Sequence, residues 1–408
     1  MNAARRRELE ALRRVREADV YKGDVLAARL RRVDAGIEFT YLPEYRDAGG
    51  RSVATTLPLT DQPLITTAGA VPPFFAGLLP EGRRLTAVRR AVKTSADDEL
   101  SLLLAVGNDA VGDVRVLPAG HDATAMVEVA VQLSDAEQLD FSELLSDTGY
   151  FDSTAIAGVQ DKVSARMISV PVAQAERRFI LKLNPPEFPM VVENEHYFVQ
   201  LAKRAGMTVP DSQLIRDRKG EAALLIERFD RTVDVRGNPV RHAVEDAAQL
   251  LGLYPADKYT VSMEAVTLRI AELCAAHAVA LRDVYRQVCF AWLTGNGDLH
   301  AKNISVMRYG DEWRVTPAYD LPSTLPYGDT SMALSVGGRA TGLSRKRLIA
   351  FAESIGLATA LASRVLDEVL DATASAPADL EHGAVPLDSR RIRDTVRSLN
   401  ARRRTSLA

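Results

Sequence analysis

The sequence is poor in cysteine, in net charge and in long apolar runs, and each shortage excludes a class of protein. Two cysteines in 408 residues are too few for a disulfide scaffold, which favours a reducing, intracellular compartment. The formal net charge of −3 gives no overall attraction to nucleic acid or to an anionic membrane. No stretch reaches the roughly 18 uncharged apolar residues of a membrane span, and the arginine-rich N-terminus lacks the apolar segment of a signal peptide. We therefore expect a cytoplasmic protein that does not contact a membrane.

The rest of the composition is that of an ordinary globular protein. Hydrophobic residues make up 47% and charged residues 26% of the chain, which excludes a disordered or fibrous protein. The length predicts two or three units of roughly 100–200 residues each. Local patterns predict a basic helix over residues 1–18, a small α+β unit over 19–120, a strand-rich part over 121–235 and a helical part over 236–408. A strand-rich part followed by a helical part predicts two lobes around a cleft.

Periodicity predicts the elements that frame this cleft. Alternating apolar and polar residues, or short apolar runs between turn signals, predict strands over Gly36–Tyr41, Arg178–Leu183 and Ala222–Glu227. Helical spacing of apolar residues predicts helices over Glu193–Ala205 and Val244–Leu250.

The arginines near the N-terminus alternate with Leu9, Leu12 and Val15 at helical spacing. Two interpretations fit this basic helix. It contacts nucleic acid or a protein partner, or it is a solvated helix that packs one thin apolar stripe on the rest of the protein. The solvated helix is the favoured interpretation, because runs of charge are usually solvated faces.

The segment Gly297-Asp298-Leu299-His300-Ala301-Lys302-Asn303 carries the most informative chemistry. Asp298 and Asn303 have the D-x-x-x-x-N spacing of kinase catalytic loops, in which the Asp accepts the proton of the attacking hydroxyl and the Asn holds a magnesium ion. Asp320, after the next strands, is placed to be the second metal carboxylate. By itself the spacing is a weak signal, because two turn-forming residues at this distance also occur in ordinary loops.

Two more side chains of this segment are candidates for catalysis. Lys302 lies beside the predicted γ-phosphate and either stabilises developing negative charge or is a surface lysine. His300 is a metal ligand, a general base or a hydrogen-bonding support for the loop. No histidine or cysteine lies at a zinc-ligand spacing from it, which favours the support.

Upstream residues provide candidates for binding a nucleotide. Lys182 lies in a strand that is otherwise apolar, where a lysine is costly unless it is paired. Glu195 in the next helix is its candidate partner, as in the kinase ion pair that orients nucleotide phosphates; the alternative is an edge lysine whose head reaches water. A further candidate is the turn Ala157-Gly158-Val159-Gln160-Asp161-Lys162, because the backbone amides of a turn can bind phosphates. The strand that ends near Glu227 and Phe229 lies where the lobes should meet, so its backbone is a candidate to read an adenine.

Six motifs in order resemble the HipA family of serine/threonine-protein kinases, the toxins of type II toxin–antitoxin systems. They are Gly158-Val159-Gln160-Asp161-Lys162, Ile180-Leu181-Lys182-Leu183, Glu193-Asn194-Glu195, Ile226-Glu227-Arg228-Phe229-Asp230-Arg231, Gly297-Asp298-Leu299-His300-Ala301-Lys302-Asn303 and Ala318-Tyr319-Asp320. The unit over residues 19–117 is similar to the N-terminal subdomain of that family. Its matching segments are Phe74-Phe75-Ala76-Gly77-Leu78-Leu79-Pro80-Glu81-Gly82 and Ala105-Val106-Gly107-Asn108-Asp109-Ala110-Val111-Gly112-Asp113.

The resemblance implies an α+β fold, two-lobed and like that of protein kinases and phosphatidylinositol kinases, with the family's N-terminal subdomain and a helical C-terminal lobe. It implies transfer of the γ-phosphate of ATP, with Mg2+, to a protein hydroxyl, with aminoacyl-tRNA synthetases as the target class and arrest of growth as the outcome. It also implies a HipB-like helix-turn-helix antitoxin, which carries the contact with operator DNA.

The resemblance assigns roles to matching positions. Asp298 corresponds to the base, Asn303 and Asp320 to the magnesium ligands, and Lys182 to the contact with the ATP phosphates. Glu227 and Phe229 correspond to the hinge near adenine, and residues 157–162 to the phosphate-binding loop.

One position departs from the family pattern. Relatives carry an autophosphorylated regulatory serine just before Ile-Ala-Gly, and this chain has Ala155 there. Ser153 and Thr154 lie beside it as candidate substitutes for autophosphorylation.

Two alternatives stay open. The G-D-x-H-x-x-N pattern at Gly297 also resembles aminoglycoside and choline kinases, which phosphorylate small molecules, but that likeness leaves the unit over 19–117 without an explanation. The other alternative is a non-catalytic co-repressor tethered to DNA by an antitoxin. The presence of Lys182, Asp298, Asn303 and Asp320 favours catalysis.

Overall fold

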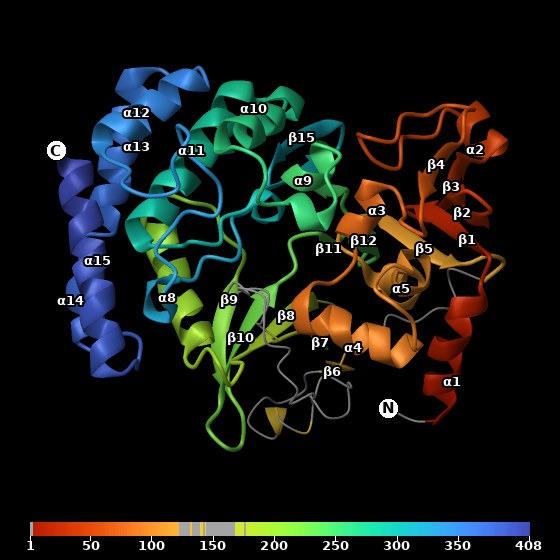
Figure 1. Ribbon diagram of the computed structural model, residues 1–408, viewed down its shortest axis with the longest axis horizontal. Coiled ribbons are helices and arrows are strands. Elements are labelled where there is room, and N and C mark those ends of the chain that lie inside the picture. The colour runs from red at the N-terminus through yellow and green to blue at the C-terminus, as the bar shows by residue number, and fades with distance from the viewer. Residues whose placement is uncertain (1–2, 122–130, 133–138, 142, 144–167, 175–176) are drawn as a thin grey trace.

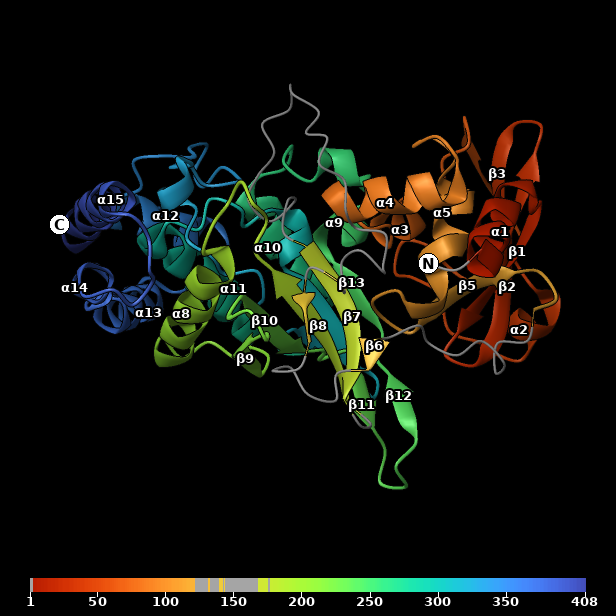
Figure 2. The ribbon, with the colours of Figure 1, turned by 90° about the horizontal axis from the view of Figure 1, so that it is seen from below.

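A computed structural model describes residues 3–121, 131–132, 139–141, 143, 168–174 and 177–408. An N-terminal subdomain (residues 3–121) lies at one end of the longest axis, and the helices that close the chain lie at the other (Figure 1). A central sheet lies between them in both views (Figures 1 and 2). Within the described residues, no helix is both long and apolar enough to cross a membrane.

The N-terminal subdomain is built on an antiparallel five-stranded sheet of order β4-β3-β2-β1-β5. The alternation in Gly36–Tyr41 predicted β3 correctly, since Ile37, Phe39 and Tyr41 are buried in the subdomain's core. The strands are β1 (Glu17–Lys22), β2 (Val25–Val33), β3 (Gly36–Tyr41), β4 (Leu64–Thr67) and β5 (Val114–Pro118). The helices beside them are α2 (Pro43–Asp47), α3 (Pro73–Gly77), α4 (Gly82–Val92), α5 (Glu99–Val106) and the 3-10 turn η2 (Gly107–Asp109).

The N-terminal helix is shorter than the sequence predicts. Helix α1 (Ala3–Ala11) and the 3-10 turn η1 (Leu12–Arg14) precede β1. The chain leaves the helix because residues from Glu17 onward pair with β2 and residues from Ala18 onward also pair with β5, and this pairing outweighs the helical spacing of the arginines. Leu12 and Val15 pack against the core of the subdomain, which is the thin apolar stripe of the solvated-helix interpretation.

The central sheet has the order β6-β7-β8-β10-β9, with one parallel pair at the β6 edge. Along β8, Leu181 and Leu183 face one apolar cluster, so Lys182 points to the opposite face. Helix α8 packs with β10 in the apolar cluster on that opposite face. The strands are β6 (Val131–Gln132), β7 (Ile168–Gln174), β8 (Arg177–Leu183), β9 (Ser212–Arg216) and β10 (Ala222–Glu227), and α8 covers Val191–Arg204.

The rest of the chain is mainly helical and contains the largest apolar core of the described residues. Its helices are α9 (Ala247–Leu250), α10 (Met263–Leu273), α11 (His277–Thr294), α12 (Arg345–Ser354), α13 (Thr359–Ala372), α14 (Ala376–Glu381) and α15 (Ser389–Leu407), with 3-10 turns η4 (Pro255–Asp257), η5 (Ala301–Asn303) and η6 (Leu325–Tyr327). The hairpin β11 (Arg231–Val233) and β12 (Pro239–Arg241) precedes a small sheet of β13 (Val244–Asp246), β14 (Ser305–Tyr309) and β15 (Glu312–Val315). The predicted helix Val244–Leu250 is therefore wrong over its first three residues. They pair with β14, and Asp246 caps α9 by accepting a hydrogen bond from Gln249 N at 2.8 Å.

A buried ionic cluster joins the N-terminal subdomain to the segment after β10. Arg228 pairs with Asp109 at 2.7 Å and with Asp230 at 2.9 Å, and Arg231 pairs with Asp230 at 2.7 Å. The Gly112 amide donates to Asp230 at 2.9 Å. Two carboxylates thus compensate two buried guanidinium groups. The positive charges of Arg228 and Arg231 lower the pKa of Asp230, although its burial alone would raise it. The subdomain is docked through charges that neither side can leave unpaired.

This cluster predicts the cost of removing one charge. Asp230→Asn leaves two buried arginines with a single carboxylate and should destabilise the docked structure by about 3–5 kcal/mol. Asp311→Asn is the matched control, because Asp311 also pairs across the boundary, with Arg51, but both groups are exposed; it should cost about 0–1 kcal/mol. Urea and thermal unfolding of the two variants measure the difference, and equal shifts of the midpoint would contradict the assignment.

Candidate active site

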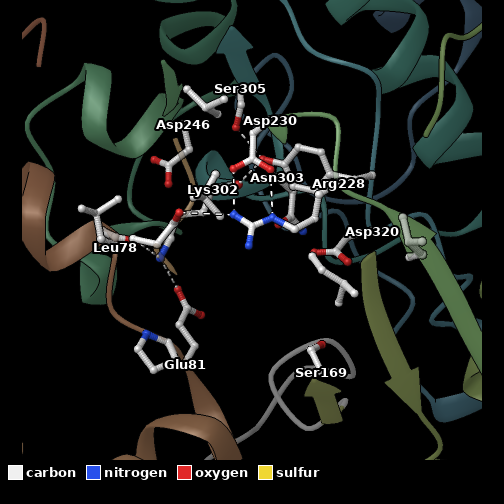
Figure 3. Close-up of a pocket in the computed structure, with 18 of the residues that line it drawn as sticks. Leu78, Glu81, Ser169, Arg228, Asp230, Asp246, Lys302, Asn303, Ser305 and Asp320 are labelled. Carbon is white, nitrogen blue, oxygen red and sulfur yellow. Dashed lines mark hydrogen bonds and ion pairs between the residues drawn. The ribbon is translucent and has the colours of Figure 1, made fainter. Parts of the chain in front are cut away.

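A cavity of ≈ 380 Å³ lies where the N-terminal subdomain, the central sheet and the helical region meet (Figure 3). It collects residues that are more than two hundred positions apart in the sequence. The predicted site residues that line it are Lys182, Glu227, Phe229, His300, Lys302, Asn303 and Asp320. Glu195 and Asp298 are each 1% exposed and lie behind this lining. The predicted phosphate loop, residues 157–162, and the positions Ser153, Thr154 and Ala155 lie outside the described residues.

Lys182 is paired inside the protein, as its apolar surroundings require. Its ammonium contacts both oxygens of Glu195 on α8, at 2.7 and 3.0 Å, and also contacts Asp320. Burial opposes the charge on Lys182, but the two carboxylates outweigh it and raise the pKa of Lys182. The interpretation as an edge lysine is wrong, since Lys182 is 6% exposed.

The loop after α11 holds Asp298 and Asn303 close together. The Asn303 side-chain amide donates to the Asp298 carbonyl oxygen at 2.8 Å. Helix α11 ends at Gly295, which has a φ of 72° that favours glycine. Gly297 has no room for a side chain, because an added Cβ would lie 2.6 Å from the Ser331 carbonyl oxygen. The two glycines let the chain turn sharply and bring Asp298 under the cavity.

Asn296 is a residue of this site to which the sequence assigned no role. Its side-chain oxygen accepts from the Asp298 amide at 2.9 Å, and its side-chain nitrogen donates to the Asp320 carbonyl oxygen at 2.9 Å. Asp320 has a φ of 53°, a left-handed conformation that costs about 1–3 kcal/mol outside glycine. Asn296 therefore links the two predicted catalytic segments. A polar residue between two glycines just before Asp298 was the available signal.

His300 is a buried and uncharged ring. Burial lowers its pKa to about 3, so the ring is neutral near pH 7 and its 4.0 Å approach to Asp298 is not an ion pair. The ring packs edge-on against Tyr259, with 5.1 Å between ring centres. Within the described part of the chain, its Nδ1 atom has no hydrogen-bond partner. His300 thus lines the cavity as a neutral ring, and the predicted hydrogen-bonding support is not seen at Nδ1.

Lys302 is not a free surface lysine, although the sequence left that alternative open. Its side chain is 12% exposed and its ammonium lies 2.8 Å from Glu81. It also donates to the Gly77 carbonyl oxygen at 3.1 Å. Both partners belong to the N-terminal subdomain, a contact that no local pattern around Lys302 indicates.

The opposite side of the cavity is mainly apolar. Phe229 lines it beside Ile180 and Ile226, and its ring lies 5.8 Å from that of Tyr319. Glu227 also lines it, but the Glu227 carboxylate binds Arg177 and its backbone amide donates to the Asp211 carbonyl oxygen at 2.8 Å. The Phe229 ring offers a face on which another flat ring can stack, whereas the Glu227 N–H is already used by Asp211.

The side-chain oxygens of Asn303 and Asp320 are suitable ligands for a magnesium ion. Both residues line the cavity, and with its nitrogen bonded to Asp298, Asn303 can offer its amide oxygen. Among the described residues, no three His, Cys, Asp or Glu side chains gather at metal-binding distances. Proteins usually bind magnesium through one or two carboxylates together with phosphates and water, so the Asp320 carboxylate and the Asn303 amide oxygen are a sufficient protein contribution.

Comparisons with known proteins identify the family. A family model described as the HipA N-terminal domain matches residues 18–117, and one described as the HipA-like C-terminal domain matches residues 154–377. A protein of Sinorhizobium fredii that is provisionally named a kinase is 34% identical over 290 residues, which are 65% of this chain and 66% of that protein. The serine/threonine-protein kinase toxin HipA of Shewanella oneidensis is 25% identical over 334 residues, 76% of each chain.

The fold agrees with these matches. A solved complex of HipA, HipB and operator DNA from Shewanella oneidensis contains a chain that superimposes with a TM-score of 0.77 at 22% identity, over 96% of this chain and 97% of that one. The α+β fold with an N-terminal subdomain is thereby confirmed. With both family domains present in order, the chain belongs to the HipA family.

Proposed function

We propose that this protein is an ATP-dependent serine/threonine-protein kinase that acts as the toxin of a toxin–antitoxin module. The observation that carries the proposal is the convergence of Lys182, Glu195 and Asp320 at a cavity that Asn303 lines, with Asp298 buried directly behind that lining. Phosphoryl transfer needs mainly a positioned base and compensation of phosphate charge, and these residues supply both. The kinase names of the relatives support the same activity.

In the proposed mechanism Asp298 takes the proton from the hydroxyl group of the substrate. As it does so, the hydroxyl oxygen bonds to the γ-phosphorus of ATP. The bond between that phosphorus and the bridging oxygen breaks, and ADP leaves. Lys182, oriented by Glu195, neutralises phosphate oxygens. Asn303 and Asp320 would hold magnesium, which neutralises further charge on the phosphates. Phe229 with Ile180 and Ile226 would cover the adenine.

The target and the partner are proposed from the family. We propose a translation protein, such as an aminoacyl-tRNA synthetase, as the substrate, and a HipB-like helix-turn-helix antitoxin as the partner. Operator DNA would be contacted only through the antitoxin. The composition of the solved complex from Shewanella oneidensis supports the antitoxin and its operator DNA, whereas the target class comes from the resemblance to the family alone.

Loss of the base should separate catalysis from binding. Asp298→Asn should lower transfer of labelled phosphate from ATP to proteins of a cell lysate by about 100-fold or more, because the amide cannot accept the hydroxyl proton. ATP binding, followed by calorimetry, should be retained. Asp311→Asn, at an exposed carboxylate, is the control. Equal labelling by wild type and Asp298→Asn would remove Asp298 from the mechanism.

Loss of the buried ammonium should weaken nucleotide binding. Lys182→Met removes a charge-assisted bond to the phosphates, worth about 1.5–3 kcal/mol, and should raise the Kd for ATP roughly 10- to 100-fold. Lys219→Met is the matched control, because Lys219 is a half-exposed lysine paired with Asp140 away from the cavity. An unchanged Kd in a variant that melts like wild type would refute the phosphate contact.

The departure at Ala155 predicts weak self-modification. After incubation with ATP and magnesium, mass spectrometry should find little or no phosphate on Ser153 or Thr154, because the residue at the regulatory position has no hydroxyl. Stoichiometric phosphate on either residue would mean that the regulatory site has moved by one or two positions. The variant Ala155→Ser restores the hydroxyl and is the positive control.

A further inference from the structure

The N-terminal subdomain contributes an acidic side chain to the cavity. Glu81 lies between α3 and α4, and together with Leu78 it lines a wall of the cavity (Figure 3). Its carboxylate binds two ammonium groups of the helical region. One oxygen is 2.8 Å from Lys302, and the other contacts Lys258.

Charge keeps this contact in place. Burial alone would raise the pKa of Glu81, but the ammonium groups of Lys302 and Lys258 hold it at about 2. Glu81 is therefore ionised at every pH at which the protein would be assayed. Lys258 is 8% exposed on its side chain, so removal of the carboxylate would leave a buried cation with its main acidic partner gone.

The bonds of Lys302 set its direction. An ammonium has three N–H groups, and Glu81 and the Gly77 carbonyl oxygen each take one. The wall that offers them is itself anchored, because the Gln249 side chain donates to the Phe74 carbonyl oxygen at 2.9 Å. Lys302 lines the cavity beside Asn303. One of its donors therefore remains for a group inside the cavity.

Lys258 extends the contact toward the predicted base. Its ammonium lies 5.2 Å from the centre of the Tyr259 ring, and the Tyr259 hydroxyl donates to Asp298 at 3.3 Å. The Lys258 carbonyl oxygen accepts from the Ala301 amide at 3.3 Å. Glu81 thus contacts the catalytic loop directly at Lys302, and it also binds Lys258, which packs on the Tyr259 ring beside Asp298.

Glu81 is one of several contacts between the N-terminal subdomain and the rest of the chain. The buried Glu245 accepts hydrogen bonds from the Thr55 amide and hydroxyl, at 2.9 and 2.7 Å. Arg83, two residues after Glu81, pairs with Glu187 across the same boundary. Neither Arg83, Glu187 nor Glu245 lines the cavity. Among these boundary carboxylates, Glu81 differs by touching a lysine of the catalytic loop.

We propose that Glu81 is a positioning residue of the active site, supplied by the N-terminal subdomain, which aims the Lys302 ammonium at the phosphoryl group in transfer. The inference rests on the proposed kinase function. It assigns to the N-terminal subdomain a part in the chemistry of a site whose other predicted residues lie after position 156.

Steady-state release of ADP by the full-length protein, with ATP and magnesium chloride, tests the proposal. Glu81→Gln should lower kcat by about 10- to 100-fold, the size expected when a catalytic group is misplaced. The KM for ATP should change little, because Lys182 and the apolar wall are untouched. Glu187→Gln, which breaks the neighbouring boundary pair, should keep wild-type kcat. Glu81→Asp keeps the charge but shortens the reach, and its kcat should lie between the other two.

A double variant shows whether Glu81 acts through Lys302. The kcat of Glu81→Gln with Lys302→Ala should equal that of Lys302→Ala alone. The proposal would be overturned if the double variant lost kcat by the product of the two single losses. It would also be overturned if Glu81→Gln were at least as active as wild type. If Glu81→Gln does not fold, wild-type kcat in Glu81→Asp overturns it instead. An inactive wild type would refute the kinase function itself, whereas an active wild type with an indifferent Glu81 refutes only this inference.

Discussion

The buried ammonium of Lys182 is the constraint on which the site depends. A lysine inside a sheet is tolerated when carboxylates surround it, and here Glu195 and Asp320 do so. One carboxylate comes from a helix packed on the sheet and the other from the segment after β15. Pairing this one charge therefore brings the segment after β15 to β8 and the helix that follows β8. Lys182 and Asp320 form one wall of the cavity because the buried Lys182 ammonium must be paired with carboxylates.

A second set of charges joins the N-terminal subdomain to this arrangement. The cluster of Arg228, Arg231, Asp109 and Asp230 docks the subdomain beside the segment that follows β10. The contact between Glu81 and Lys302 reaches the catalytic loop itself. In both places burial makes an unpaired charge expensive, so the two regions have little freedom to separate. The subdomain is therefore a wall of the active site as well as a neighbouring unit.

Local elements were largely predictable, and the errors lie where long-range pairing competes with local pattern. The strands around Lys182 follow from short apolar runs, and the end of α8 follows from Gly206, whose φ is 72°. The helix predicted over Val244–Leu250 is wrong at its start because those residues pair with β14. The N-terminal helix ends early because β1 completes a sheet with strands on both sides. Hydrogen bonds to distant strands leave no periodic trace in a short segment.

The sequence by itself determined the chemistry available: a buried lysine with a candidate carboxylate partner, the spacing from Asp298 to Asn303, and Asp320 after the next strands. Such inferences hold because cost of burial and residue spacing are properties of the chain alone. Only the tertiary structure decided that His300 is a neutral buried ring, that Asn296 links two catalytic segments, and that Lys302 is bound by Glu81. Those outcomes depend on which surfaces pack together. Glu81 and Lys302 are 221 positions apart, and docking of the N-terminal subdomain brings them into contact.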